Sequence, residues 1–225
     1  MKDSDRRRLL KYLLAGSVAY PATSSALWFF NDDKEIKPIH RWSGSIKING
    51  HPLQPTSIIK PGDTIETGED SEIVFTQGKD AYLLRSNTRM VLNNNKGVVD
   101  ILRLLGGAVL SVFGSGKKKI KTPTAIIGIR GTGTYLEVVD RETYLCTCYG
   151  KTEITSNDDP SVTENISTRH HEEPRFIRNT AQGVIIKKAP VRNHSDAELI
   201  MLESTVGRKP PFLDDSSGDD IDWGY

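Results

Sequence analysis

The stretch Thr122–Val138, TPTAIIGIRGTGTYLEV, has a glycine-rich core, GIRGTG, with the composition of a phosphate-binding loop. Such a loop lies between a strand and a helix, whose N-terminal N–H groups receive the phosphate. Here both flanks, TAIIGI and TYLEVV, are rich in β-branched and aromatic residues, and no helical pattern follows. We therefore predict that the glycines form a bend or bulge between strands, where positive φ or close backbone approach is needed.

The same texture extends from Trp42 to about Thr155. Short apolar or alternating runs recur about every eight to ten residues, with Gly, Asn and Asp between them. The runs are SIKI, TSIIK, DTIET, EIVF, AYLL, MVL, AVLSVF, IIGI, TYLEVV and TYLCTCY. No sustained helical period interrupts them, so the pattern predicts an all-β domain over residues 42–155.

Residues 156–207 form a predicted C-terminal extension. Its first part is polar and irregular, which is typical of a long loop, and a strand pair is expected around Arg175–Ile177 and Val184–Lys187. Ser195 and Glu198 have capping-box spacing, which predicts a short helix over 196–206 that Gly207 closes. Residues 208–225 carry two basic and five acidic side chains and are expected to be a loosely held tail.

The first 30 residues carry five basic and two acidic side chains. The sequence DRRRLLK followed by an apolar stretch resembles a twin-arginine export signal, although an ordinary basic region before a signal sequence is the alternative. Ser24–Ala26 suits a cleavage site, whereas LWFF after it extends the apolar run toward a membrane anchor. Both interpretations place the remaining chain in the periplasm or outside the cell.

The overall charge argues against nucleic-acid binding. The formal net charge is +1, and the opposite charges lie at the two ends of the chain. Nucleic-acid binding requires a concentrated basic face, which this distribution does not indicate.

A succession of motifs from Gly44 to about Ile154 resembles the FecR domain, an extracytoplasmic sensor module. The motifs are KPGDTIETG (60–68), Asp70-Ser71, DAYLLR (80–85), the run 104–112, TPTA (122–125) and IRGT (129–132). The resemblance implies an all-β, solenoid-like or sandwich-like stack of short strands that binds proteins and has no catalytic machinery. Regulators of this family usually carry a cytoplasmic sigma-factor-binding segment before the membrane span. Few residues precede the apolar segment here, so only the fold and the binding character are expected to carry over.

Both cysteines lie in one motif, TYLCTCYG, as Cys146 and Cys148. On an extended strand their side chains point to the same face, with Cα atoms about 6.7 Å apart. That separation is at the upper limit for a disulfide, so a bond between them would be strained unless the strand bends. Two neighbouring thiols without a third cysteine suit a soft metal ion such as Cu(I) or Zn(II).

Three of the five histidines, His170, His171 and His194, lie in the C-terminal half. With the cysteines they could supply a closed Cys2His2 site for zinc, copper or iron, or a haem site. Their spacing matches no known zinc-finger pattern, and the histidines lie on a presumed loop. The alternative is a pair of half-buried or disulfide-bonded thiols and solvent-exposed histidines.

Two basic features have structural and binding interpretations. Lys117–Lys119 are expected at a hairpin tip that keeps strand edges soluble, with an anionic lipid surface or acidic partner as the alternative. The second is the turn of Arg130, Gly131, Thr132 and Gly133. The guanidinium of its arginine is expected to hydrogen-bond loop carbonyls or a carboxylate and so fix the turn, and contact with a partner is the alternative.

The sequence leaves two functions open. No nucleophile elbow or carboxylate pair stands out, so we expect no enzyme. The first function is an extracytoplasmic binding or sensor module that engages an envelope protein or ligand in signalling. The second is a metal- or redox-linked sensor that uses the cysteine pair and nearby histidines. Neither the partner nor the signal can be read from the residues.

Overall fold

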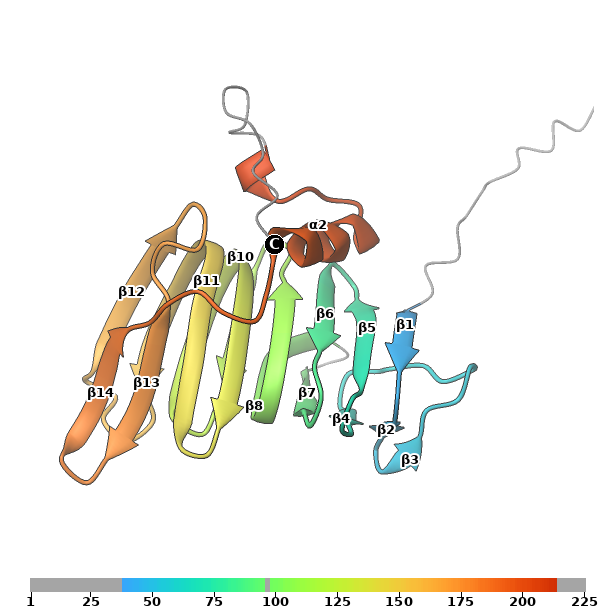
Figure 1. Cartoon of the computed structure of the whole chain (residues 1–225), viewed down its shortest axis with the longest axis horizontal. Helices are drawn as coiled ribbons and strands as arrows, with labels where there is room; N and C mark the ends of the chain where they lie inside the picture. Colours follow the sequence, from blue (N-terminus) through green and yellow to red (C-terminus); the bar gives the residue numbers. More distant parts are fainter. Residues whose placement is uncertain (1–37, 96–97, 214–225) are drawn as a thin grey trace, which may run out of the picture. The chain divides into compact units, whose positions relative to one another are not determined.

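Strands dominate the computed structural model, which describes residues 38–95 and 98–213. The predicted signal or anchor and the acidic tail beyond residue 213 lie outside this range. The fold is all-β, as predicted (Figure 1). The strands are β1 (Ile39–Ser43), β2 (Ile46–Ile48), β3 (His51–Pro52), β4 (Thr64–Thr67), β5 (Glu72–Gln77), β6 (Asp80–Leu84), β7 (Arg89–Asn95), β8 (Val98–Val112), β9 (Lys117–Lys121), β10 (Ala125–Val139), β11 (Glu142–Ser156), β12 (Thr163–Thr168), β13 (Arg175–Thr180) and β14 (Gly183–Lys188). They are followed by helix α2 (Asp196–Thr205) and a 3₁₀ turn, η1 (Pro211–Leu213).

Three long strands, β8, β10 and β11, pair with different neighbours along their first and second halves. The first half of β8 pairs with β7 and β9, and its second half pairs with β6 and β10. Likewise, β11 pairs with β13 near its start and with β12 near its end. The sheet therefore folds into two layers. The front layer runs β14-β13-β11-β10-β8-β6-β5-β1 (Figure 1), and the back layer runs β12-β11-β10-β9-β8-β7-β4-β2-β3.

The long strands change layer at glycines. In β8 the change falls at Gly106 and Gly107, where the ladder with β7 shifts register and Gly107 has a φ of +82°. In β10 the register shifts between Arg130 and Gly133, which confirms the bulge predicted for GIRGTG, although it lies within one continuous strand and not between two. A bulge bends a strand and increases its local twist, so each glycine segment lets one strand serve both layers.

Two apolar clusters result from this folding. The first fills the space between the layers and includes Leu136 and Leu145 from the front and Ile127 from the back. The second lies on the outer face of the front layer, where Tyr144 and Cys146 alternate with inward-facing Leu145. The chain after β14 covers this outer face, and α2 packs against β6 and β8 (Figure 1).

Leu199 and Leu202 of α2 are fully buried in the second cluster, as the predicted helical face requires. The helix lies between its predicted limits, and the backbone N–H of Ser195 donates to Glu198 Oε2 at 3.0 Å. Within the described residues, no helix is long and apolar enough to cross a membrane.

Two sequence predictions in this part were wrong. Thr56–Lys60 forms no strand, because Pro55 and Pro61 on either side cannot donate ladder hydrogen bonds. The polar stretch predicted as a loop contains β12, which pairs with β11 alone and buries Ile166. As an edge strand it needs few apolar residues, so its composition resembles that of a loop. The strand pair predicted near residues 175 and 184 is confirmed as β13 and β14.

Gly107→Ala tests the layer change in β8. A Cβ at this position would lie 2.4 Å from the Cα of Thr88. Gly78 also has positive φ (+62°) but has open space around it, so Gly78→Ala is the matched control. We expect each substitution to cost about 1 kcal/mol for the left-handed backbone. Gly107→Ala should cost about 2 kcal/mol more from overpacking. Urea unfolding measures both, and equal losses would contradict this account of the bend.

Candidate metal centre

Cys146 and Cys148 lie on the outer face of the front layer, in the middle of β11. The alternation of the strand places both thiols on the same side, as predicted. Neither side chain is exposed to solvent, and both are free thiols. Tyr135 of β10 lies directly opposite Cys146 in the ladder. The thiols are thus fully buried, more deeply than the half-buried alternative supposed.

His171 is brought to the cysteines by the turn between β12 and β13. Its backbone N–H donates to the carbonyl of Cys148 at 2.9 Å, and its φ of +55° completes the turn. The Nδ1 atom of its ring lies 3.4 Å from Cys146 Sγ. The chain reversal after β12 therefore places one histidine of the His170-His171 pair against the thiols.

His194 comes from the segment between β14 and α2. Its ring stacks on Tyr135 with centroids 4.6 Å apart, and its Nε2 lies 3.0 Å from His171 Nδ1. The segment is held to the sheet by an ion pair between Arg192 and Glu137 at 2.5 Å. Arg192 also lies over the ring of Tyr144, 4.5 Å from its centroid. This segment belongs to the chain after β14, residues 189–213, which we call the C-terminal cover. The C-terminal cover thus contributes the fourth candidate ligand.

These four side chains form a compact donor set. The sulfur atoms of Cys146 and Cys148 and one ring nitrogen each of His171 and His194 all lie within 4.8 Å of one another. In a tetrahedral zinc site with Zn–S bonds of about 2.3 Å and Zn–N bonds of about 2.0 Å, donor atoms lie roughly 3.3–3.8 Å apart. Closing the set on an ion therefore requires shifts of about 1 Å or less.

Hydrogen bonds outside the donor set determine which nitrogen of each histidine carries a proton. His194 Nδ1 lies 2.7 Å from the carbonyl oxygen of Arg192, and His171 Nε2 lies 3.0 Å from Asp196 Oδ1. Both oxygens only accept, so both of these nitrogens donate. The nitrogens that remain, His171 Nδ1 and His194 Nε2, lie 3.0 Å apart, and in neutral rings both would be acceptors. Two facing acceptors require a cation between them, either a proton or a metal ion.

The protonation of the thiols fits a cation-binding site. The pKa of Cys146 is lowered to about 4, chiefly because Cys148 donates a hydrogen bond to it, with His171 and His194 assisting against burial. Burial raises the pKa of Cys148 well above its usual value, and the negative charge of Cys146 raises it further. Burial lowers the pKa of His171, but Cys146 and Asp196 outweigh burial and raise it. A metal ion would displace the remaining protons.

His170 is not part of the donor set. Its Nε2 lies 2.9 Å from both carboxylate oxygens of Asp196, and its ring packs against Phe212. Asp196 therefore accepts from His170 and His171 together, and it orients the candidate ligand His171 from outside. Sequence reasoning missed Asp196, because its place in the first turn of a capped helix already explained a carboxylate there.

Cys146, His171 and Asp196 also have the order of a nucleophile, a base and an orienting carboxylate. Cys146 has no exposed surface for a substrate to approach. In this arrangement no substrate can reach the thiol, so the four donor atoms describe the site better than a catalytic triad does.

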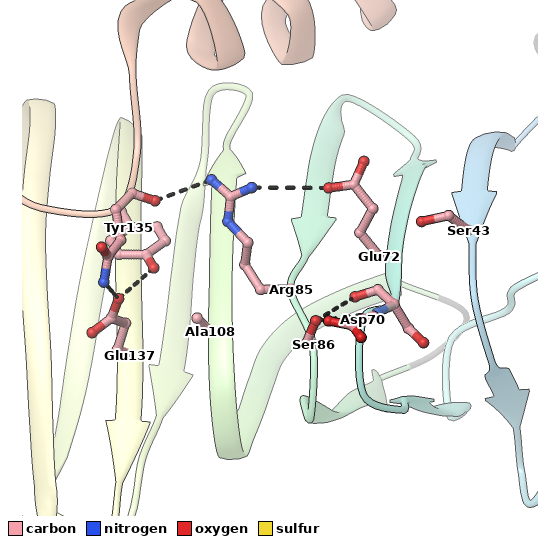
Figure 2. A pocket seen from close by; sticks show the side chains of 10 residues that line it. Ser43, Asp70, Glu72, Arg85, Ser86, Ala108, Tyr135 and Glu137 are labelled. Atoms are coloured by element: carbon pink, nitrogen blue, oxygen red, sulfur yellow. Dashed lines mark hydrogen bonds and ion pairs between the residues drawn. The ribbon is translucent and has the colours of Figure 1, made fainter. Parts of the chain in front are cut away.

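A polar pocket of about 670 Å³ lies beside the candidate centre, on the same face of the sheet (Figure 2). Arg85 crosses it and bonds Glu198 of α2 at 2.6 Å and the carbonyl of Asn193 at 3.0 Å. Glu137 accepts from Tyr135 and from Asn193, each at 2.5 Å. Through these hydrogen bonds, Arg85 and Glu137 hold Asn193 and Glu198 of the C-terminal segment against the sheet.

The GIRGTG motif lies outside both sites. Thr132 is buried, and its hydroxyl donates to the carbonyls of Arg130 at 2.8 Å and Lys151 at 3.0 Å. Gly133 leaves room for the ring of Tyr149, which a Cβ would meet at 2.5 Å. Arg130 itself is exposed and has no side-chain hydrogen bond or ion pair among the described residues, so the expected structural pin is Thr132 instead.

Lys117–Lys119 do not form a hairpin tip. They begin β9, which has β8 and β10 as neighbours on its two sides, so they protect no sheet edge. Lys118 turns away from its neighbours and forms an ion pair with the buried Asp80 at 2.7 Å.

Comparisons with known proteins are limited to part of the fold. No protein-family model and no curated protein matches this chain. Two crystal structures of a proposed anti-sigma factor from Parabacteroides distasonis ATCC 8503, at 1.65 Å and 2.50 Å resolution, resemble it with a TM-score of 0.46 and 15% sequence identity. Each match covers 56% of this chain and 59% of the other, so the chain spans less than two thirds of its structural neighbours. The FecR resemblance remains a prediction from sequence motifs.

Proposed function

We propose that this chain is a non-enzymatic sensor module whose signal is a metal ion held by Cys146, Cys148, His171 and His194. The observation that carries the proposal is the convergence of two thiols with two imidazole nitrogens, while the other nitrogen of each ring is held by an oxygen outside the set. A proton on His171 can be shared with His194 or with the Cys146 thiolate, but it does not engage all four groups at once. A metal ion uses all four donors.

Zinc is the ion that best fits this donor set. Two thiolates and two neutral imidazoles form one of the common closed tetrahedral zinc sites. Cu(I) shares the affinity for thiolates and is the main competitor, whereas iron lacks a specific feature in its favour. Four protein ligands leave no open coordination position for a reactant, so the site suits structural or sensing roles and not catalysis.

The proposed ion would connect three segments that are distant in sequence. Cys146 and Cys148 belong to β11, His171 to the turn after β12, and His194 to the segment that leads into α2. Ser195 begins the helix directly after His194, so a metal bond to His194 holds the first turn of α2 in place. An ion that binds only when α2 is docked stabilises the docked state by mass action.

The same thiols make the proposed sensor responsive to redox conditions. Metal binding requires thiolates, and oxidation of Cys146 and Cys148 to a disulfide would remove two of the four ligands. Metal occupancy would thus require both the ion and a reducing environment, or loading of the ion before export.

We further propose that the chain works outside the cytoplasm and engages an envelope protein. The support is the twin-arginine-like N-terminus and the FecR-like succession of motifs between residues 44 and 154. Under this proposal, the docked or released state of the C-terminal cover is what a partner would read.

Metal binding is tested by substituting a single ligand. We expect the full chain to bind about one zinc ion, and His194→Gln to weaken binding at least about 100-fold, since a tetrahedral site then lacks a ligand. His51→Gln, in an exposed histidine of β3, is the matched control and should bind as the wild type does. Isothermal titration with zinc, and the visible spectrum after cobalt substitution, measure both. Equal zinc affinity in the two variants would refute the site.

Coupling to the helix is tested by hydrogen exchange. With zinc at about 100 times its Kd, amide exchange across Asp196–Thr205 should slow by up to about 100-fold. Asp196→Ala removes the group that orients His171 and should weaken zinc binding by about 10- to 100-fold. Ser204→Ala, at an exposed position of the same helix, should leave zinc affinity unchanged. If zinc binds but amide exchange in α2 does not slow, the metal site is not coupled to docking of the helix, and the sensor role is contradicted.

A further inference from the structure

The back layer carries a row of positive charge that the metal site does not use. Lys117 of β9, Arg130 of β10 and Lys151 of β11 lie directly opposite one another in the two ladders. All three are exposed. Opposite residues on neighbouring strands have Cβ atoms about 5 Å apart, so three cationic side chains gather within roughly 10 Å. We name this row, together with Lys119 beside it, the basic row.

The cations of the basic row have no partners within residues 38–95 and 98–213. Among the described residues, none of the four forms an ion pair or a side-chain hydrogen bond, in contrast to neighbouring Lys118, which pairs with Asp80. Like charges placed directly opposite in a sheet destabilise it. The arrangement therefore costs stability when nothing negative is bound.

The surface at the basic row is hollowed. A pocket of about 430 Å³ is lined by the four cations and Lys118, by Ile126, and by residues of β11 and β12 that include one carboxylate, Glu153. Gly128 faces Lys119 on one side and Glu153 on the other, and its missing side chain leaves space between them. The bulge that follows Arg130 bends β10 at the end of this hollow. The result is a concave site with cations along one side.

We propose that the basic row is the docking site for an acidic segment of a protein partner, a short stretch rich in Asp and Glu. This inference rests on the proposed role of the chain as a protein-binding module, and it assigns the surface and the chemistry of the partner. It uses no residue of the metal site. Carboxylates at the row would pair with Lys117, Arg130 and Lys151 and relieve their mutual repulsion.

An anionic membrane is the main alternative ligand, and the surface fits it less well. Peripheral binding to a bilayer usually combines basic residues with exposed apolar side chains that enter the interface. The exposed large apolar side chains among the described residues are Trp42, Ile58, Leu105, Val139, Ile185 and Val191. None of them lines the hollow. A concave site is also better matched to a narrow chain than to a flat bilayer.

The test uses a fluorescein-labelled hexa-aspartate peptide and the full chain, with binding followed by fluorescence anisotropy at low salt. The variant Arg130→Gln, Lys151→Gln removes two charges of the row and leaves uncharged polar side chains in their place. The matched control, Lys47→Gln, Lys209→Gln, removes two exposed charges elsewhere. We expect binding at least about tenfold weaker in the first variant, unchanged binding in the control, and weaker binding of the wild type as salt rises.

Equal peptide affinity in the two double variants would overturn the proposal. So would binding of the wild type to vesicles containing phosphatidylserine without binding to the peptide, since that would assign the row to a membrane. Removing two repelling charges should leave the melting temperature equal to or above that of the wild type, which separates lost binding from lost folding. Each measurement is made with zinc and with a chelator. Failure of the metal site would appear in the zinc titrations and leave the peptide result unchanged.

Discussion

The whole structure depends on strands long enough to serve two layers. β8, β10 and β11 have 15 residues each, and each changes ladder partners partway along. A strand can only do this where the backbone can bend, which explains the glycines at residues 106–107 and 131–133. Because continuous strands join the two layers, a single sheet supplies the side chains on both sides of the core between them.

The same constraint creates the need for a C-terminal cover. The space between the layers is filled by one face of each strand, so the apolar residues on the opposite face of the front layer need another partner. Tyr135, Tyr144 and Cys146 are on that face. The chain after β14 supplies the partner, and the hydrogen bond from Tyr144 to the carbonyl of Pro190 at 2.9 Å shows how the cover is anchored before α2 begins. The thiols are buried because the cover lies over them.

The fold could largely be predicted from the sequence because its signals are local. β-branched residues, glycine breaks and the capping box each act over a few residues, and they predicted most of the described strands and helix α2. The failures also have local causes. The run at Thr56–Lys60 is apolar but enclosed by two prolines, and β12 is an edge strand whose polar side chains face outwards. The two-layer arrangement could not be predicted, because it depends on which strand pairs with which.

The candidate site was only partly predictable. The spacing of Cys146 and Cys148 requires a shared face on any strand, so their proximity followed from the sequence. The choice between His170 and His171 did not, because it depends on the left-handed backbone of His171 in the turn. The role of Asp196 could not be predicted either, for a different reason. A carboxylate in the first turn of a helix is common on electrostatic grounds, and its contact with both histidines appears only once α2 is docked.

The location of the ligands decides what the proposed site can do. A catalytic centre must open to admit substrate and remain assembled while it is open. Here the cover that would have to open carries His194 and Asp196, so opening it disassembles the donor set. Assembly of the site and docking of the cover are therefore one event, and the affinity for the ion and the stability of the docked cover must rise together. That reciprocity is what the proposed sensor role requires, because occupancy of the site would then change the position of a chain segment.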